Sequence, residues 1–161
     1  MRLASILLAA SAAAGCTAFG GGALTPGVST EAQLRGAMGA PAVEFAHADG
    51  SRTLAYPSGP MGTQTYMAEL APNGTVRAVR PVLKEEVFQS IQPGMTRDEV
   101  LRLIGPPGDS MAFPRRRQVS WEYNFRDAWG YRALFFVDFD ERGIVVGKFT
   151  RRIDNDRSRD R

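Results

Sequence analysis

Residues 93–107 read PGMTRDEVLRLIGPP and contain the clearest signals of secondary structure in the chain. Thr96 is a strong candidate for a helix N-cap, and Glu99 three positions later completes a capping box. Gly105 can adopt the left-handed conformation that ends a helix, and the prolines after it prevent continuation. The side chains between these ends supply one apolar stripe: Val100, Leu101, Leu103 and Ile104. The stretch therefore predicts a short helix with defined ends.

The sequence on either side of this helix predicts further elements. Residues 82–91 carry apolar residues four positions apart, which indicates another short helix. Residues 119–125 alternate between apolar and polar side chains, as a half-buried strand does. Two more strands, 134–139 and 144–149, are joined by a turn at 140–143. The unit thus reads helix, helix, strand, strand, strand.

An earlier part of the chain repeats this unit in weaker form. Residues 26–41 parallel residues 93–107, and two matched strand blocks follow in the same order. Ser29 can still cap the first helix. Ala32 stands where the second unit has Glu99 of the capping box, and Gln33 stands where it has Val100, which can form a hydrophobic staple with the residue before the cap. The leading helix is missing, because residues 17–25 are rich in glycine. The matched strand blocks are 53–56 with 120–123, and 66–70 with 135–139.

Unit size decides how the copies combine. A unit of about 60 residues buries only about 60% of its unfolded surface and is marginal alone. We therefore predict an α+β fold of tandem ααβββ-type units, the first degenerate, with a joined antiparallel sheet and the helices packed on one face. The predicted segments are a signal peptide (1–15), a flexible tether (16–25), the degenerate repeat (26–80), the well-formed repeat (81–150) and a disordered charged tail (151–161).

The N-terminus predicts lipid anchoring. Residues 1–15 combine one cation with an apolar run too short to span a bilayer, which fits a signal peptide. Small residues lead directly into Cys16, which resembles a bacterial lipobox in which this cysteine becomes the acylated first residue. The alternative is ordinary cleavage after Ala14, which would leave a free thiol near the new terminus.

Composition excludes several kinds of chemistry. The chain of 161 residues has 20 basic and 17 acidic residues, a balance that argues against nucleic-acid binding. One Cys and one His exclude internal disulfides and most metal or His-dependent catalytic clusters. His47–Ser51 and Asp138–Gly143 contain the letters of a hydrolase triad and part of a calcium loop, and both are better read as hairpin turns. We expect no catalytic residues, no metal, no cofactor and no small-molecule substrate.

The second unit resembles a known family. Its pattern is Pro93-Gly94-Met95-Thr96, Val100, Gly105-x-Pro107, Trp121-x-Tyr123, and Val137-x-Phe139 with Gly143. This pattern is similar to the SmpA/OmlA domain of BamE, a small lipoprotein of the outer-membrane β-barrel assembly machinery. The resemblance covers residues 81–149 well and 26–80 weakly. Tandem domains of this type also resemble the β-lactamase inhibitory proteins.

The resemblance implies a location and a function. Thr17 after the cysteine, where an Asp would favour the inner membrane, implies an outer-membrane lipoprotein that faces the periplasm. The implied function is a non-enzymatic protein-binding scaffold in outer-membrane protein assembly or envelope integrity, partnered by an outer-membrane or periplasmic protein. The alternative is an inhibitor of a periplasmic or cell-wall hydrolase.

Two segments are candidate partner-binding sites. Trp129 and Tyr131 fall at a predicted connection between strands, where exposed aromatic residues are typical interface anchors. Arg115, Arg116 and Arg117 offer contact with anionic lipid headgroups or an acidic partner. The alternatives are that the aromatic residues belong to the core and that the arginines form a solvated loop.

Overall fold

The chain is an α+β protein in which a helix followed by four strands occurs twice. The computed structural model describes residues 17–19 and 22–153. A short strand pair comes first, β1 (Thr17–Phe19) and β2 (Gly22–Leu24). The first unit is α1 (Glu31–Met38), β3 (Val43–Ala46), β4 (Arg52–Pro57), β5 (Thr65–Leu70) and β6 (Val76–Pro81). The second is α2 (Glu85–Gln89), α3 (Arg97–Ile104), β7 (Asp109–Phe113), the 3-10 turn Pro114–Arg116, β8 (Gln118–Arg126), β9 (Arg132–Asp140) and β10 (Val145–Arg152).

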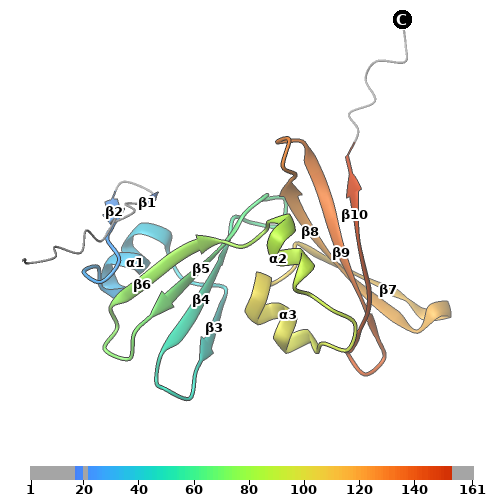
Figure 1. The fold of residues 1–161 in the computed structure, drawn as a ribbon, viewed down its shortest axis with the longest axis horizontal. Coiled ribbons are helices and arrows are strands. Elements are labelled where there is room, and N and C mark those ends of the chain that lie inside the picture. Colours follow the sequence, from blue (N-terminus) through green and yellow to red (C-terminus); the bar gives the residue numbers. More distant parts are fainter. Residues whose placement is uncertain (1–16, 20–21, 154–161) are drawn as a thin grey trace, which may run out of the picture.

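The strands form two separate four-stranded antiparallel sheets. Their strand orders are β3-β4-β5-β6 and β10-β9-β8-β7, so each sheet is a meander in which consecutive strands pair. The prediction of one joined sheet is therefore wrong. The physical reason is that α2 and α3 lie between the two sheets (Figure 1), where they cover apolar faces that edge-to-edge joining would have left open.

Capping bonds fix where both main helices begin. In α3, the Thr96 side chain accepts a hydrogen bond from the backbone N–H of Glu99, and the Glu99 carboxylate accepts one from the Thr96 N–H in return. The predicted capping box is thus confirmed. In α1 the cap is Thr30, paired with Gln33 in the same way. Ser29, the expected cap, is instead buried and its hydroxyl accepts a hydrogen bond from the Thr25 N–H.

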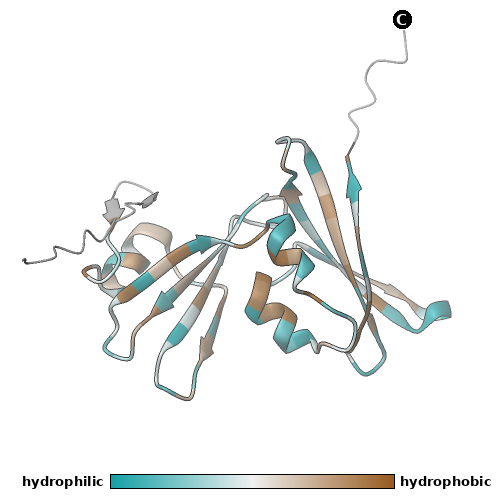
Figure 2. Cartoon of the chain, in the orientation of Figure 1, coloured by the Kyte–Doolittle hydropathy of each residue, from teal (hydrophilic) through white to brown (hydrophobic). Residues whose placement is uncertain are grey.

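The two sheets share one hydrophobic core around α3. Val100 and Ile104 of α3 lie in a cluster that takes Ala55 and Met67 from the first sheet and the aromatic face of the second: Tyr123, Phe125, Phe135 and Phe139. A smaller cluster fills the opposite face of the first sheet, around the fully buried Leu34 of α1. Figure 2 shows hydrophobic residues along α3, the helix that lies between the two sheets. The first sheet is therefore packed on both faces.

Several predicted boundaries are corrected. The predicted tether at residues 16–25 contains the β1–β2 pair, and its Leu24 is buried. The helix predicted at 82–91 is confined to α2. Strand β10 continues through Arg152, so the predicted charged tail does not begin at residue 151. The predicted signal peptide, Cys16 and residues 154–161 lie outside the described residues.

A fourth strand in each unit was not predicted. Strands β3 and β7 precede the three strands that the sequence indicates. All five residues of β7 are exposed, so the strand has no alternating burial pattern that a sequence could reveal.

No helix in residues 17–19 and 22–153 is long and apolar enough to span a membrane.

Candidate protein-binding site

The loop between β8 and β9 is organised by one carboxylate, that of Asp127. Its Oδ1 accepts hydrogen bonds from the backbone N–H groups of Trp129 at 3.0 Å and of Tyr131 at 2.9 Å. The turn is closed by backbone bonds from Asp127 to Tyr131 and from Gly130 to Asp127. Gly130 supplies the positive φ of 83° that this turn requires. The loop is therefore held in one conformation by its own polar groups.

Strand β10 braces the same carboxylate. The guanidinium of Arg152 donates to Asp127 Oδ2 at 2.6 and 2.9 Å, and it lies 4.9 Å from the centre of the Tyr131 ring. Burial alone would raise the pKa of Asp127, but hydrogen bonds from Arg152 and from the two loop N–H groups hold this pKa below its usual value. The carboxylate is thus ionised at neutral pH and remains an acceptor for all of these donors.

The aromatic side chains carried by this loop face solvent. Trp129 is 79% exposed and Tyr131 is 59% exposed. The alternative interpretation, that these two residues belong to the core, is therefore wrong for both. A large aromatic side chain on a fixed loop loses little conformational entropy when a partner covers it, which is the usual property of an interface anchor.

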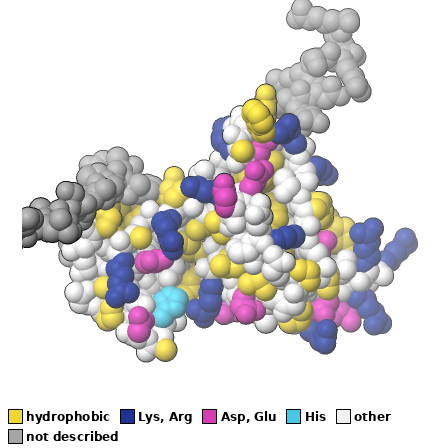
Figure 3. Space-filling model, in the orientation of Figure 1, with side chains coloured by type: hydrophobic (Ala, Val, Ile, Leu, Met, Phe, Trp, Pro, Cys, Tyr) yellow, Lys and Arg dark blue, Asp and Glu magenta, His cyan; other side chains and the backbone are white. Residues whose placement is uncertain are grey.

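The three candidate arginines lie at the opposite end of β8. Arg115 and Arg116 belong to the 3-10 turn after β7, and Arg117 follows with a left-handed φ of 54°. Arg117 forms an exposed ion pair with Glu141 at 3.7 Å. Figure 3 shows basic side chains gathered at this tip of the molecule, and Figure 1 shows the β8–β9 loop at the other end of the sheet. With about 3.3 Å per strand residue, β8 separates the two clusters by roughly 30 Å. They are two surfaces, not one site.

The outer face of the second sheet holds a hollow that sequence reasoning missed. Its volume is about 230 Å³, and its walls include Met111, Phe113, Phe136, Phe149 and Arg151. The rings of Phe136 and Phe149 stack at 4.6 Å, and the Arg151 guanidinium lies 5.5 Å from the Phe136 ring. One feature of the sequence does indicate this hollow: residues 134–139 place apolar side chains on both faces of the strand, so one apolar set faces away from the core.

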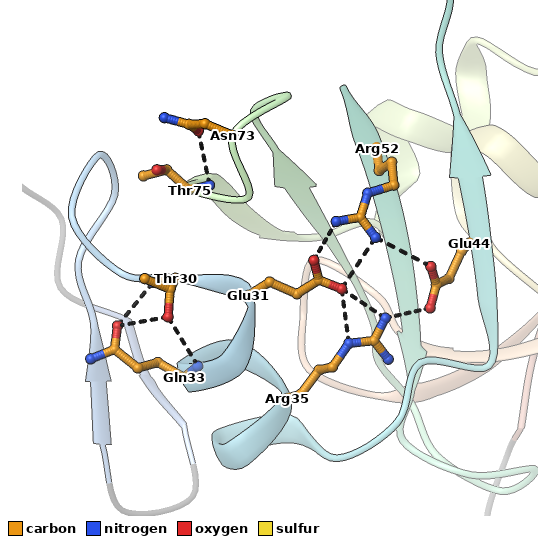
Figure 4. A network of polar contacts seen from close by, with 8 residues as sticks. All are labelled: Thr30, Glu31, Gln33, Arg35, Glu44, Arg52, Asn73 and Thr75. Carbon is orange, nitrogen blue, oxygen red and sulfur yellow. Dashed lines mark hydrogen bonds and ion pairs between the residues drawn. The ribbon is translucent and has the colours of Figure 1, made fainter. Parts of the chain in front are cut away.

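A polar network on the first unit has a structural role. We call Glu31, Arg35, Glu44 and Arg52 the Glu31 cluster; it joins α1 to β3 and β4 (Figure 4). Arg35 Nη2 lies 2.8 Å from Glu31 Oε1 and 2.5 Å from Glu44 Oε1. The hydrogen bond from Arg52 lowers the pKa of Glu31 against the opposing effect of burial. Two carboxylates and two guanidinium groups neutralise one another, so the cluster fixes the helix on the sheet.

The motifs with catalytic letters form turns. His47 and Ser51 close the β3–β4 hairpin through their backbones, while the His47 ring contacts Thr53 Oγ1 at 2.9 Å. Asp140 accepts hydrogen bonds from the N–H groups of Arg142 and Ile144 in the β9–β10 turn. Both hairpin predictions are confirmed. Within the part of the chain that the structure describes, no group of three metal-ligating side chains comes together.

Comparison with known proteins identifies the second unit. Residues 81–148 match the family model of the outer membrane protein assembly factor BamE domain. The predicted resemblance is thus confirmed for these residues, and the first unit lies outside the match. A DUF4309 family protein (YjgB) from Bacillus subtilis subsp. subtilis str. 168 is also similar in structure. Its sequence identity is 14%, the match covers 86% of this chain and 88% of that chain, and the TM-score is 0.35. No curated protein matches the sequence.

Proposed function

We propose that this chain, which carries a BamE domain at residues 81–148, is a lipid-anchored outer-membrane protein that binds a protein partner in the periplasm. Its role is that of a non-enzymatic scaffold in outer-membrane protein assembly. The observation that supports this most directly is the match to a family described as an outer membrane protein assembly factor.

The geometry of the β8–β9 loop supports a role in partner binding. Trp129 and Tyr131 are exposed on a turn that Asp127 and Arg152 hold from two sides. We assign these aromatic residues as the anchor for the protein partner. The arginine turn at the other end of β8 is a second contact, suited to an acidic surface or to lipid headgroups.

A pull-down from solubilised outer membranes tests the function. We expect the tagged full chain to capture subunits that assemble outer-membrane proteins, and we expect Trp129→Ala with Tyr131→Ala to lower this capture at least tenfold. Met61→Ala is the matched control, because Met61 is 71% exposed in the β4–β5 loop, the equivalent connection of the first unit.

The outcomes of the pull-down separate the candidate functions. Capture of one soluble periplasmic or cell-wall hydrolase, without assembly subunits, would favour the inhibitor function instead. Unchanged capture by the double variant would show that the β8–β9 loop is not the binding surface. The assembly function would then require a different face of the protein.

A further inference from the structure

Strand β7 is an open sheet edge. It is the last strand in the order β10-β9-β8-β7, and all five of its residues are exposed. Along its outer side, backbone N–H and C=O groups have no strand beside them in the described part of the chain. Native sheets usually protect such an edge with a proline, a lysine or a covering segment. β7 reads DSMAF and contains neither proline nor lysine.

The side chains of β7 add apolar surface to this edge. Met111 is 51% exposed and Phe113 is 37% exposed. Both line the hollow on the outer face of the second sheet. A strand that paired with β7 would satisfy the free backbone groups and cover these two side chains at the same time.

Charges at the two ends of β7 have opposite signs. Asp109 opens the strand and pairs in register with Glu122 of β8, so two carboxylates lie side by side. Arg115 and Arg116 follow directly after the strand. Among residues 17–19 and 22–153, none of these four side chains forms an ion pair. The edge therefore has one acidic end and one basic end, and neither has an ion-pair partner among the described residues.

We propose that two copies of this chain pair through β7, antiparallel and about a two-fold axis at Met111. Antiparallel pairing places the acidic end of each strand beside the basic end of the other, whereas parallel pairing would place like charges together. Pro114 has no N–H to continue the ladder, which limits it to residues 109–113 and puts Met111 at the centre. The pairing is isologous, so it closes as a dimer with one eight-stranded sheet.

This pairing does not depend on the proposed assembly function. The ladder is short, and a dimer held by five residues a side is weak in dilute solution. The interaction is therefore best captured by a covalent link formed at the two-fold axis. At that axis, facing Cα atoms of antiparallel strands lie about 4.5–5.5 Å apart, which is within the range that a disulfide spans.

Disulfide trapping in the full chain, expressed in cells with its own leader, tests the pairing. We expect Met111→Cys to give a reducible dimer on mild oxidation. Phe113→Cys is the matched control on the same face of the same strand. Its two copies would lie about 13 Å apart along the strands and should link at least fivefold less. The parent chain, whose only cysteine is Cys16, provides the blank.

Charge reversal tests the orientation. In the Met111→Cys background, Arg115→Glu with Arg116→Glu should lower the dimer yield at least threefold, and adding Asp109→Lys should restore it. Because the substituted residues are exposed, circular dichroism and thermal unfolding should show an unchanged fold. Equal linking by Met111→Cys and Phe113→Cys, no linking by Met111→Cys, or linking only to a different protein would overturn the proposal.

Discussion

Asp127 controls the presentation of the candidate binding loop through a single side chain. Its two oxygens accept hydrogen bonds from the N–H groups of Trp129 and Tyr131 and from the guanidinium of Arg152. Loss of this carboxylate would leave the loop without its internal acceptor, although the exposed ring of Trp129 would remain. The position is therefore a sensitive test of whether loop order, rather than aromatic surface alone, matters for binding.

We predict that Asp127→Ala weakens partner capture without unfolding the chain. The effect should be smaller than that of Trp129→Ala, because the anchor side chain is still present on a looser loop. Capture from solubilised membranes gives the comparison, and Asp49→Ala is the control at another turn carboxylate that accepts from its own loop. An Asp127→Ala chain that binds as well as the parent would contradict the prediction.

The same carboxylate gives a prediction about pH. Because the pKa of Asp127 is lowered in the folded chain, the loop bonds are fully present above the ordinary pKa of an Asp, near 3.9, and are lost as pH falls through the lower folded value. In an NMR titration, the amide signals of Trp129 and Tyr131 should hold steady at neutral pH and shift together only below about pH 4. The Asp127→Asn chain should not show this step.

Cys16 carries the prediction about location. Under the proposed lipid anchoring, Cys16→Ala should release the chain from the membrane fraction into the soluble periplasm. Immunoblotting of fractionated cells measures this, with Cys16→Ala compared with the parent chain and a known membrane lipoprotein as marker. Retention of Cys16→Ala in the membrane would rule out anchoring through this residue.

Among the elements, α3 was the easiest to predict because its signals are local. Thr96 and Glu99 satisfy each other's backbone groups, and Gly105 ends the helix at φ 77°. Both ends are determined by neighbours a few residues away, so a single sequence is enough to place them. The cap of α1 is Thr30 rather than the predicted Ser29: Gln33 completes a capping box with Thr30, whereas Ser29 is buried and has Ala32 at the corresponding position.

What could not be predicted depends on pairing and packing that no local sequence pattern reveals. Strand β7 has no burial pattern, and its place in the sheet comes from pairing with β8. The separation of the two sheets depends on where α3 inserts, which no local signal encodes. At the candidate site, the sequence indicated Trp129 and Tyr131 but not Asp127, whose role depends on Arg152 at a distance of 25 residues.

We predict that removing the α3 cap destabilises the whole chain. Thr96→Ala deletes the side-chain acceptor for the Glu99 N–H, a change that typically costs about 1 kcal/mol of unfolding free energy. Chemical denaturation with fluorescence detection measures it. Thr150→Ala on the exposed surface of β10 is the control and should change the unfolding free energy by less than about 0.5 kcal/mol.

At the scale of the whole molecule, Gly105 marks how closely the two units approach. A Cβ built there would lie 2.8 Å from Thr65 Cγ2 and 3.5 Å from Met67 Cε, both in the first unit. Thr65 is buried, so its methyl group has little room to move. The equivalent glycine of the first unit, Gly39, has a similar positive φ of 81° but no atom within 4 Å of its Cβ position.

These two glycines form a matched pair for testing the interface between the units. Gly39→Ala and Gly105→Ala should each lose about 1–3 kcal/mol, because both backbones occupy a conformation that only glycine readily adopts. Gly105→Ala should lose a further 1–3 kcal/mol or so from the clash with Thr65. Denaturant titrations of both variants give the difference, and equal losses would show that the units are not packed closely in solution.

The shared core also predicts how the units depend on each other. A chain that begins at residue 81 would expose the surface of α3 that now contacts Ala55 and Met67. We expect such a chain to lack the cooperative thermal transition of the full chain and to bind a dye specific for exposed apolar surface. A sharp transition at the parent's midpoint would mean that the BamE domain stands alone.

Strand β8 separates the exposed aromatic side chains at one of its ends from the arginines at the other. Under the proposed function, a partner at the aromatic end leaves the basic end free for a second neighbour, which in the proposed dimer is the other copy of the chain. The spacing between those neighbours would then be set by the rigid length of one strand, and lengthening the hairpins, rather than changing their chemistry, would be the way to retune it.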